Sequence, residues 1–254
     1  MIVSWNDRLL AEEEVKVSPF DGGLLRGEGV FETMRALDGR VCFWARHYAR
    51  LLNSAARLSI VVPDPEVMER GISHVLEGNE LTGGLARIRL TLSENVLITA
   101  VPLPHPAKAC RVVTSASPIN EWSPLAGAKV CSYAENMTVL RASGVDEAIR
   151  PNTRGELCEG CLSNVFFVKD GVVNTPSLKT GCLPGVTRSV LLERNPEFLE
   201  GRWPMGILEQ AEEIWLTSST RLMTWVDEFE GRLMGPPSEL FQRTLADLRE
   251  AAKH

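Results

Sequence analysis

Apolar and polar residues alternate in short runs over the first part of the chain, a pattern typical of strands with one buried face. The predicted strands of this part are residues 2–5, 9–10, 30–36, 41–43 and 85–93. Asp38-Gly39 is a strong signal for a hairpin turn between two of them. Apolar residues recur at helical spacing in residues 47–59 and 63–76, which predicts two helices.

Residues 102–127 are rich in proline, serine and alanine, which marks a crossing between domains. Beyond the start of this crossing, the predicted strands are residues 112–113, 147–150, 165–168, 172–174 and 214–216. The predicted helices are residues 132–142, 184–192 and 238–252. Short strands separated by helices in two unequal halves predict an α+β fold. We expect an N-terminal domain at residues 1–114 and a C-terminal domain at residues 115–254.

Charge and length limit the classes of partner. The 254 residues carry 27 Lys and Arg against 33 Asp and Glu, a net charge of −6. Binding to a phosphate backbone needs a basic surface, so nucleic acid is not expected as a partner. No apolar run approaches the roughly 20 residues that cross a bilayer, and the first residues soon become polar, unlike a signal peptide. We therefore expect a cytoplasmic protein without a membrane partner.

Six cysteines in a chain of this length, without an export signal, indicate reduced thiols. Cys158 and Cys161 form a CxxC pair, but a zinc site would need a second cysteine pair or a nearby histidine pair. Buried or incidental thiols are the favoured interpretation. No metal is predicted.

Two segments have the residue types that bind a phosphate. In residues 183–188, Pro184 at a first helical position leaves the opening N–H groups of a helix available for an anion, and Thr187 adds a hydroxyl. Arg50 lies three residues after His47 on one helix face, where its planar guanidinium would bind two phosphate oxygens. The alternatives are an ordinary helix start and a solvated arginine.

Two further residues suggest covalent chemistry. Lys129 follows a loop of small residues and precedes a predicted helix, where the helix dipole does not favour a cation. A lysine that is partly desolvated or near other cations becomes a nucleophilic amine. Glu159 lies among small and apolar residues before a predicted strand, and a buried carboxylate needs a cation such as a protonated pyridine nitrogen. The alternatives are a surface lysine and a solvated glutamate.

Taken together and in this order, these segments resemble the class IV, fold-type IV pyridoxal-phosphate enzymes. This family includes branched-chain and D-amino acid aminotransferases and aminodeoxychorismate lyases. The similar segments span nearly the whole chain: residues 26–33, 47–51, the Lys129 segment, 159–166, 181–188 and 216–219. The resemblance implies two α/β domains, the larger C-terminal one a pseudo-barrel, with the cofactor site between them and a homodimeric assembly.

The resemblance also implies a role for each matching residue. Lys129 would bind pyridoxal 5′-phosphate covalently and then serve as the general acid and base, while Glu159 would keep the pyridine nitrogen protonated. The residues implied to bind the phosphate are Arg50, Val186 and Thr187 through their backbone N–H groups, and Ser219. Tyr133 would contact the phenolic oxygen of the ring. The implied reaction moves an amino group between an amino acid and a 2-keto acid by a ping-pong mechanism.

Two arginines bear on the choice of substrate. The family usually has an aromatic residue where this chain has Arg26, and Arg87 and Arg89 lie on one face of a predicted strand. Arg26 from a partner subunit and Arg89 would form a trap for a carboxylate, a pattern that resembles an unusual branch of the D-amino acid aminotransferases. The usual Arg-Gly pair of that group is replaced by Ser93-Glu94-Asn95. The alternative is that both arginines form salt bridges with nearby acids.

Two other functions remain open. An aminodeoxychorismate lyase, which releases pyruvate and p-aminobenzoate, would use the same Lys129 and Glu159, and its substrate has two carboxylates. A non-catalytic relative would act as a binding protein. The lysine, the glutamate and the phosphate-binding residues together argue against the non-catalytic alternative.

Overall fold

The computed structural model describes residues 1–104 and 109–253, which fold into two compact units. The first unit contains residues 1–104, 128–132 and 252–253, and the second contains residues 109–127 and 133–251. The predicted division into residues 1–114 and 115–254 stays a prediction. In the structure, the short segment that contains Lys129, residues 128–132, belongs to the first unit.

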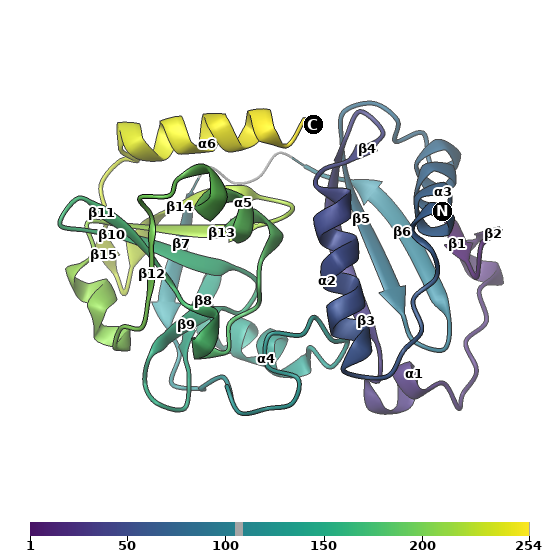
Figure 1. The fold of residues 1–254 in the computed structure, drawn as a ribbon, viewed down its shortest axis with the longest axis horizontal. Coiled ribbons are helices and arrows are strands. Elements are labelled where there is room, and N and C mark those ends of the chain that lie inside the picture. Colours follow the sequence, from purple (N-terminus) through teal and green to yellow (C-terminus); the bar gives the residue numbers. More distant parts are fainter. Residues whose placement is uncertain (105–108, 254) are drawn as a thin grey trace. The chain divides into compact units, whose positions relative to one another are not determined.

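A six-stranded antiparallel sheet forms the centre of the first unit (Figure 1). In spatial order its strands are β2 (Arg8–Ala11), β1 (Ile2–Trp5), β6 (Val96–Pro102), β5 (Leu85–Leu92), β3 (Val30–Leu37) and β4 (Arg40–Val41). Alternation along β5 buries Ala86, Ile88, Leu90 and Leu92 on one face. The other face of β5 therefore carries its polar side chains, among them Arg89.

Helices cover the apolar face of this sheet. The helices of the unit are α1 (Gly22–Arg26), α2 (Trp44–Ala56) and α3 (Pro65–Gly78), with a 3-10 turn η1 (Glu12–Glu14). α2 packs on β3, and α3 packs on β1 and β6 (Figure 1). The core between them includes Met34, Leu51, Ile72, Ile88 and Ile98. Burial of this apolar surface is the main force that holds the helices on the sheet.

A larger mixed sheet forms the second unit. In spatial order its strands are β12 (Leu199–Gly201), β11 (Val172–Pro176), β10 (Asn164–Lys169), β13 (Glu213–Ser218), β14 (Leu222–Phe229), β7 (Ala109–Thr114), β8 (Glu147–Pro151) and β9 (Leu157–Gly160), and β15 (Arg232–Leu233) pairs with β14. β9, at the end of this order, also contacts β10 and β11 near the other end. The sheet therefore curls into a pseudo-barrel, as expected.

Three helices surround the pseudo-barrel (Figure 1). They are α4 (Ala134–Ser143), α5 (Val186–Arg194) and α6 (Glu239–Ala251), and two 3-10 turns are η2 (Leu178–Thr180) and η3 (Met205–Gln210). α4 packs on β8, α5 on β13 and α6 on β14. α4 ends where Gly144 adopts a left-handed conformation with φ of +67°, which glycine adopts without strain. The α+β fold predicted from the sequence is confirmed.

Several predicted element boundaries were wrong. Residues 41–43 were expected to be a strand, but β4 ends at Val41 and Phe43 turns left-handed with φ of +59°. α2 then begins at Trp44, three residues earlier than predicted, because Trp44 and Tyr48 extend its apolar face and their rings are 5.6 Å apart. Five strands were not predicted: β6, β9, β12, β14 and β15.

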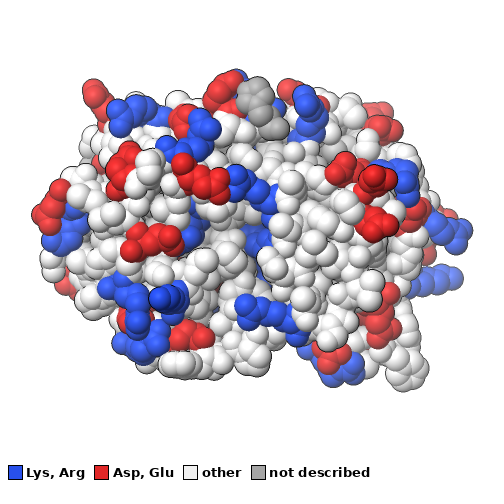
Figure 2. All heavy atoms as spheres, in the orientation of Figure 1, with Lys and Arg blue, Asp and Glu red and all other residues white. Residues whose placement is uncertain are grey.

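Charged side chains of both signs are interspersed on the faces in view in Figure 2. No helix within residues 1–104 and 109–253 is long and apolar enough to cross a membrane.

Candidate active site

Lys129 lies in an extended segment that is bound to the first sheet. Its carbonyl accepts a hydrogen bond from the Phe31 N–H at 3.0 Å, and the next residue, Val130, forms a β-bridge with Val30. Its own N–H donates to Ser54 Oγ on α2 at 3.1 Å. α4 begins only at Ala134, so the expected position of Lys129 at a helix entrance is wrong. Strand pairing and α2 fix its backbone instead.

The side chains of Lys129 and Arg89 both contact the Phe31 ring. The Lys129 Nζ lies 4.4 Å from the centre of the Phe31 ring, and the Arg89 guanidinium carbon lies 3.8 Å from it. The negative face of an aromatic ring attracts cations at such distances. The predicted placement of Arg87 and Arg89 on one strand face is also confirmed, because both are exposed between buried neighbours.

Arg26 occupies the end of α1 and forms an ion pair on the surface. Its Nε and Nη2 donate to the two carboxylate oxygens of Glu28, each at 2.6 Å. Hydrogen bonding between the two side chains lowers the pKa of Glu28 and raises the pKa of Arg26. Of the two interpretations given for Arg26, the salt bridge with a neighbouring acid is therefore present in this structure.

Arg50 is buried against β3 together with two other polar side chains. Its Nε and Nη2 donate to Glu32 Oε1 and Oε2 at 2.8 and 2.7 Å, and His47 Nδ1 lies 2.7 Å from Glu32 Oε2. Burial alone would raise the pKa of Glu32, but the Arg50 charge and the hydrogen bonds from Arg50 and His47 hold it at about 2. His47, Arg50 and Ser54 share one face of α2, so this helix positions both Arg50 and the backbone of Lys129.

In the second unit, Glu159 lies within β9, the short strand that precedes β10, and not in a solvated turn. Its Oε2 accepts hydrogen bonds from the Leu183 N–H at 2.9 Å and from Asn164 Nδ2 at 3.4 Å. Asn164 also donates to the Leu183 carbonyl at 2.9 Å. These bonds fix the orientation of the carboxylate and tie β9 to the loop that precedes α5.

The same loop shapes the start of α5. The helix begins at Val186 with Gly185 as its N-cap, so the expected place of Pro184 as the first helical residue is wrong. A Cβ on Gly185 would lie 1.9 Å from Asn164 Oδ1, and only glycine fits there. Asn164 therefore lies against both Glu159 and the N-terminus of α5.

The N-terminus of α5 has the groups that a phosphate needs. The N–H groups of Val186 and Thr187 have no partner within the helix, as for any first turn. Thr187 Oγ1 and Thr217 Oγ1 are buried without a hydrogen-bond partner among the described residues. Asn164 pairs with Thr217 in the β10–β13 register, and Ser219 follows two residues later, half-buried. Orphaned buried hydroxyls beside a helix N-terminus fit a phosphate monoester.

Tyr133 directs its hydroxyl to the protein backbone. It donates to the Cys161 carbonyl at 2.9 Å, and Asn136 Nδ2 donates to the same carbonyl at 2.7 Å. Burial, together with the charge of Glu159, raises the pKa of the Tyr133 hydroxyl. Tyr133 is therefore a neutral donor placed beside the chain that follows Glu159.

The CxxC cysteines are buried thiols. Cys158 Sγ donates to the Thr180 carbonyl at 3.3 Å, and burial raises the pKa of Cys161 to about 12. Within residues 1–104 and 109–253, no group of three or more His, Cys, Asp or Glu side chains could hold a metal ion. The geometry therefore gives these thiols a packing role.

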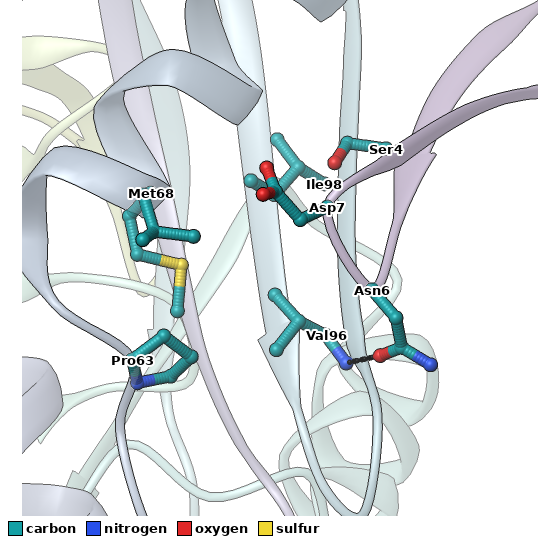
Figure 3. Close-up of a pocket in the computed structure, with 8 residues that line it drawn as sticks. Ser4, Asn6, Asp7, Pro63, Met68, Val96 and Ile98 are labelled. Carbon is teal, nitrogen blue, oxygen red and sulfur yellow. Dashed lines mark hydrogen bonds between the residues drawn. The ribbon is translucent and has the colours of Figure 1, made fainter.

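A separate cavity of about 240 Å³ lies between the β1–β2 turn and α3 in the first unit (Figure 3). Its wall is largely apolar, with Val67, Met68 and Ile98, and Asn6 Oδ1 accepts the Val96 N–H there at 2.9 Å. None of the predicted site residues lines it.

Three residues with a role in this geometry were missed by sequence reasoning. Ser54, Asn164 and Glu32 hold Lys129, Glu159 and Arg50 in place. Glu32 and Asn164 lie inside segments already singled out by the family resemblance, and Ser54 follows Arg50 by one helical turn. Spacing on α2 was therefore the one available signal for Ser54.

The chain is similar to known proteins over most of its length. A family model described as Amino-transferase class IV matches residues 29–229. Aminodeoxychorismate lyase of Bacillus subtilis is 32% identical over 241 residues, covering 84% of this chain and 82% of the relative. D-alanine aminotransferase of Staphylococcus epidermidis is 25% identical over 250 residues, covering 89% and 88%. The crystal structure of branched-chain aminotransferase from Thermoproteus uzoniensis with norvaline aligns with a TM-score of 0.90 at 27% identity, covering 98% of this chain and 94% of that one.

Proposed function

Because the chain belongs to the class IV aminotransferase family, whose members depend on pyridoxal 5′-phosphate, we propose that Lys129 and Glu159 carry its chemistry at this cofactor. The bound cofactor supplies a sink for the electron pair released at the substrate α-carbon. In the proposed ping-pong cycle, an amino acid leaves as a keto acid after giving up its amino group, and a second keto acid then accepts that group.

Each residue has a definite task in this proposal. The Lys129 amine removes and returns the proton at the substrate α-carbon, and Glu159 holds the proton of the ring nitrogen. Arg50, the N–H groups of Val186 and Thr187, and Ser219 bind the phosphate. Tyr133 contacts the phenolic oxygen of the ring, and its single O–H would leave the Cys161 carbonyl to donate there.

The observation that carries the proposal is the fixed position of Lys129. Its backbone is bound on both sides, by Phe31 on β3 and by Ser54 on α2, while its amine lies over the Phe31 ring. A proton-transfer group needs a defined position, because small displacements lower the rate. Pairing with a strand and a helix gives this lysine such a position.

Reductive trapping tests the assignment of Lys129. Borohydride treatment of the protein with pyridoxal phosphate should attach the cofactor irreversibly to Lys129, as found by peptide mapping. The Lys129→Ala variant should show no labelling at this position. A protein that takes up no cofactor would contradict the proposal and favour the non-catalytic relative.

For the substrate, we propose that Arg89 and Arg26 of a partner subunit bind a carboxylate. The position of Arg89 over the Phe31 ring, which the Lys129 amine also contacts, supports this. The similarity to D-alanine aminotransferase makes a D-amino acid one substrate to test. Half-reactions with D- and L-amino acids, followed by the cofactor spectrum, identify the donor. If Arg89→Ala leaves KM unchanged for every amino donor, the carboxylate trap is wrong.

Aminodeoxychorismate lyase is the second candidate function, favoured by the Bacillus subtilis relative. Its substrate has two carboxylates, which a pair of arginines would suit. Turnover of aminodeoxychorismate to pyruvate and p-aminobenzoate without a keto-acid acceptor would establish the lyase. Conversion of an amino acid that requires a keto acid as acceptor would establish the aminotransferase.

We further propose a homodimer. Phe20, Leu24 and Leu25 are exposed apolar side chains in and next to α1, which ends at Arg26. Apolar side chains gathered in this way are typical of protein interfaces. Sedimentation velocity should give twice the monomer mass, and Leu24→Glu should weaken the association. The cytoplasm remains the proposed location, in keeping with six cysteines that are all free thiols.

A further inference from the structure

The first unit buries an ionic cluster where apolar contacts would be expected. Glu32, His47 and Arg50 are each buried between β3 and α2, beside the apolar core. Removing charges from water is costly, and apolar side chains of similar size often replace a buried ion pair without loss of stability. The cluster therefore suggests a use beyond holding α2 on the sheet.

The geometry of the Arg50–Glu32 pair suggests that use. Glu32 accepts hydrogen bonds from Nε and Nη2 of Arg50, which form one edge of the planar guanidinium. A guanidinium has five N–H groups, and this edge accounts for two of them. Glu32 thus fixes the plane of the Arg50 guanidinium, and a guanidinium held in one plane is suited to bind phosphate oxygens.

His47 supports the carboxylate in turn. Its Nδ1 lies 2.7 Å from Glu32 Oε2, the same oxygen that accepts from Arg50 Nη2. Burial lowers the pKa of His47, so the ring is neutral near neutral pH. An ionised carboxylate only accepts hydrogen bonds, so the Nδ1 atom of the neutral ring carries the hydrogen. His47 Nε2 is buried without a partner among the described residues.

We propose that Glu32 and His47 are positioning residues for the cofactor phosphate, with Glu32 holding the Arg50 guanidinium by one edge and His47 holding Glu32. This inference rests on the proposed function, in which Arg50 binds the phosphate. Neither residue touches the cofactor in this arrangement, so each acts on phosphate affinity through Arg50. The same logic applies to metal sites, where outer partners orient the ligands.

Comparing two forms of the cofactor isolates the phosphate contribution. Pyridoxal has the same aldehyde and ring as pyridoxal phosphate but lacks the phosphate, so the ratio of their dissociation constants reports phosphate binding alone. Glu32→Gln keeps the shape of the side chain and removes its charge. We expect this variant to weaken the binding of pyridoxal phosphate about tenfold or more and to leave the binding of pyridoxal unchanged. Titration of the cofactor-free full-length protein, followed by absorbance, measures both constants.

Arg50→Gln separates this inference from the function on which it rests. It should lower the preference for pyridoxal phosphate over pyridoxal, called the phosphate preference below, about a hundredfold. If Arg50→Gln leaves the preference unchanged, the proposed phosphate role of Arg50 is wrong. If Arg50→Gln lowers it and Glu32→Gln does not, only the positioning role is overturned. An equal loss for pyridoxal and pyridoxal phosphate in Glu32→Gln would indicate a merely structural role and overturn it too.

Two further variants guard against misfolding and against a general effect of charge. His47→Asn keeps an N–H near the position of Nδ1 and should retain the phosphate preference, whereas His47→Leu should lower it. An unchanged preference in His47→Leu would remove His47 from the proposal. Asp247→Asn is the matched control, because Asp247 binds Nε and Nη2 of Arg194 through the same edge but on the surface. It should leave both dissociation constants unchanged.

Discussion

Two arginine–glutamate pairs in the first unit share one geometry and differ in their surroundings. In both, the Nε and Nη2 of the arginine donate to the two carboxylate oxygens, at 2.8 and 2.7 Å for Arg50–Glu32 and at 2.6 Å for both bonds of Arg26–Glu28. The exposed fractions of the side chains are 8% and 1% in the first pair, but 58% and 51% in the second. The two pairs therefore differ mainly in their exposure to solvent and little in their hydrogen-bond lengths.

This difference assigns the pairs different uses. Water and salt can replace either partner of an exposed pair at little cost, so the Arg26–Glu28 pair is compatible with the proposed role of Arg26 in binding a substrate carboxylate. Glu32 has no such replacement, because its loss would take a carboxylate away from a buried guanidinium. A buried pair therefore suits a permanent support for Arg50, and an exposed pair suits an exchangeable ligand.

The largest expected effect comes from breaking the buried pair. Glu32→Ala removes a buried carboxylate that binds Arg50 through two hydrogen bonds, and we expect a loss of about 3–5 kcal/mol in the free energy of unfolding. Glu28→Ala should leave the unfolding midpoint unchanged, because both partners of that pair are solvated. Urea unfolding of the two variants beside the natural protein measures the contrast.

A double variant shows whether the loss in Glu32→Ala comes from the buried charge of Arg50. Glu32→Leu with Arg50→Met replaces both ions by apolar groups, and most of the stability should return. The phosphate preference should remain lost. Equal instability in the single and double variants would instead indicate that packing, and not charge, dominates at this position.

The next largest effect should be a loss of folding stability in acid, caused by His47 and Glu32. Burial and the opposing bond to Glu32 leave the pKa of His47 below its ordinary value of 6.5, and that of Glu32 falls from 4.5 to about 2. Both groups bind protons more readily in the unfolded chain, so folding stability falls as pH falls. The loss begins near pH 6.5 with His47 and continues from 4.5 toward 2 with Glu32, which alone contributes about 3 kcal/mol.

Unfolding measured over a series of pH values resolves the two groups. His47→Asn should flatten the part of the curve that begins near pH 6.5, and Glu28→Gln should leave the whole curve in place. A natural protein whose stability rises on acidification through this range would contradict the assigned protonation states.

The sequence predicted the secondary structure better than the surroundings of single side chains. Alternation identified β3 and β5, since each has one face in the core. The same pattern gave no distinction between Glu28 and Glu32, although one is exposed and the other is buried. That distinction depends on α2, which packs across β3 from later in the chain.

The family resemblance named Glu159 but not its surroundings. Asn164 and Leu183 approach it through the fold of the second unit, and short-range sequence patterns contain no information on contacts 5 and 24 residues apart. Strand β9 was missed for a related reason. Its four residues, Leu157–Gly160, are too short and too closely followed by another strand to show a period.

A smaller effect is expected where α2 supports Lys129 without any charge. Ser54→Ala removes the acceptor of the Lys129 N–H and should cost about 1 kcal/mol in the free energy of unfolding. Because Ser54 shares the helix face of Arg50, the variant tests whether this face matters apart from its ions. The proton-transfer rate at the substrate α-carbon should fall as well, measured in single-turnover half-reactions. A variant with full stability and full rate would show that strand pairing alone positions Lys129.

The smallest effect should come from the exposed pair, and salt should abolish it. If Glu28 competes with a substrate carboxylate for Arg26, then Glu28→Gln frees the guanidinium and lowers KM for the amino donor by about twofold at low ionic strength. The screening length falls to about 3 Å at 1 M salt, so the natural protein and the variant should then have equal KM values. A reduction that persists at 1 M salt would mean that Glu28 acts on the substrate by contact and not through an exchangeable charge. A rise in KM would show that Glu28 holds Arg26 in place, as Glu32 is proposed to hold Arg50, and the contrast between the two pairs would disappear.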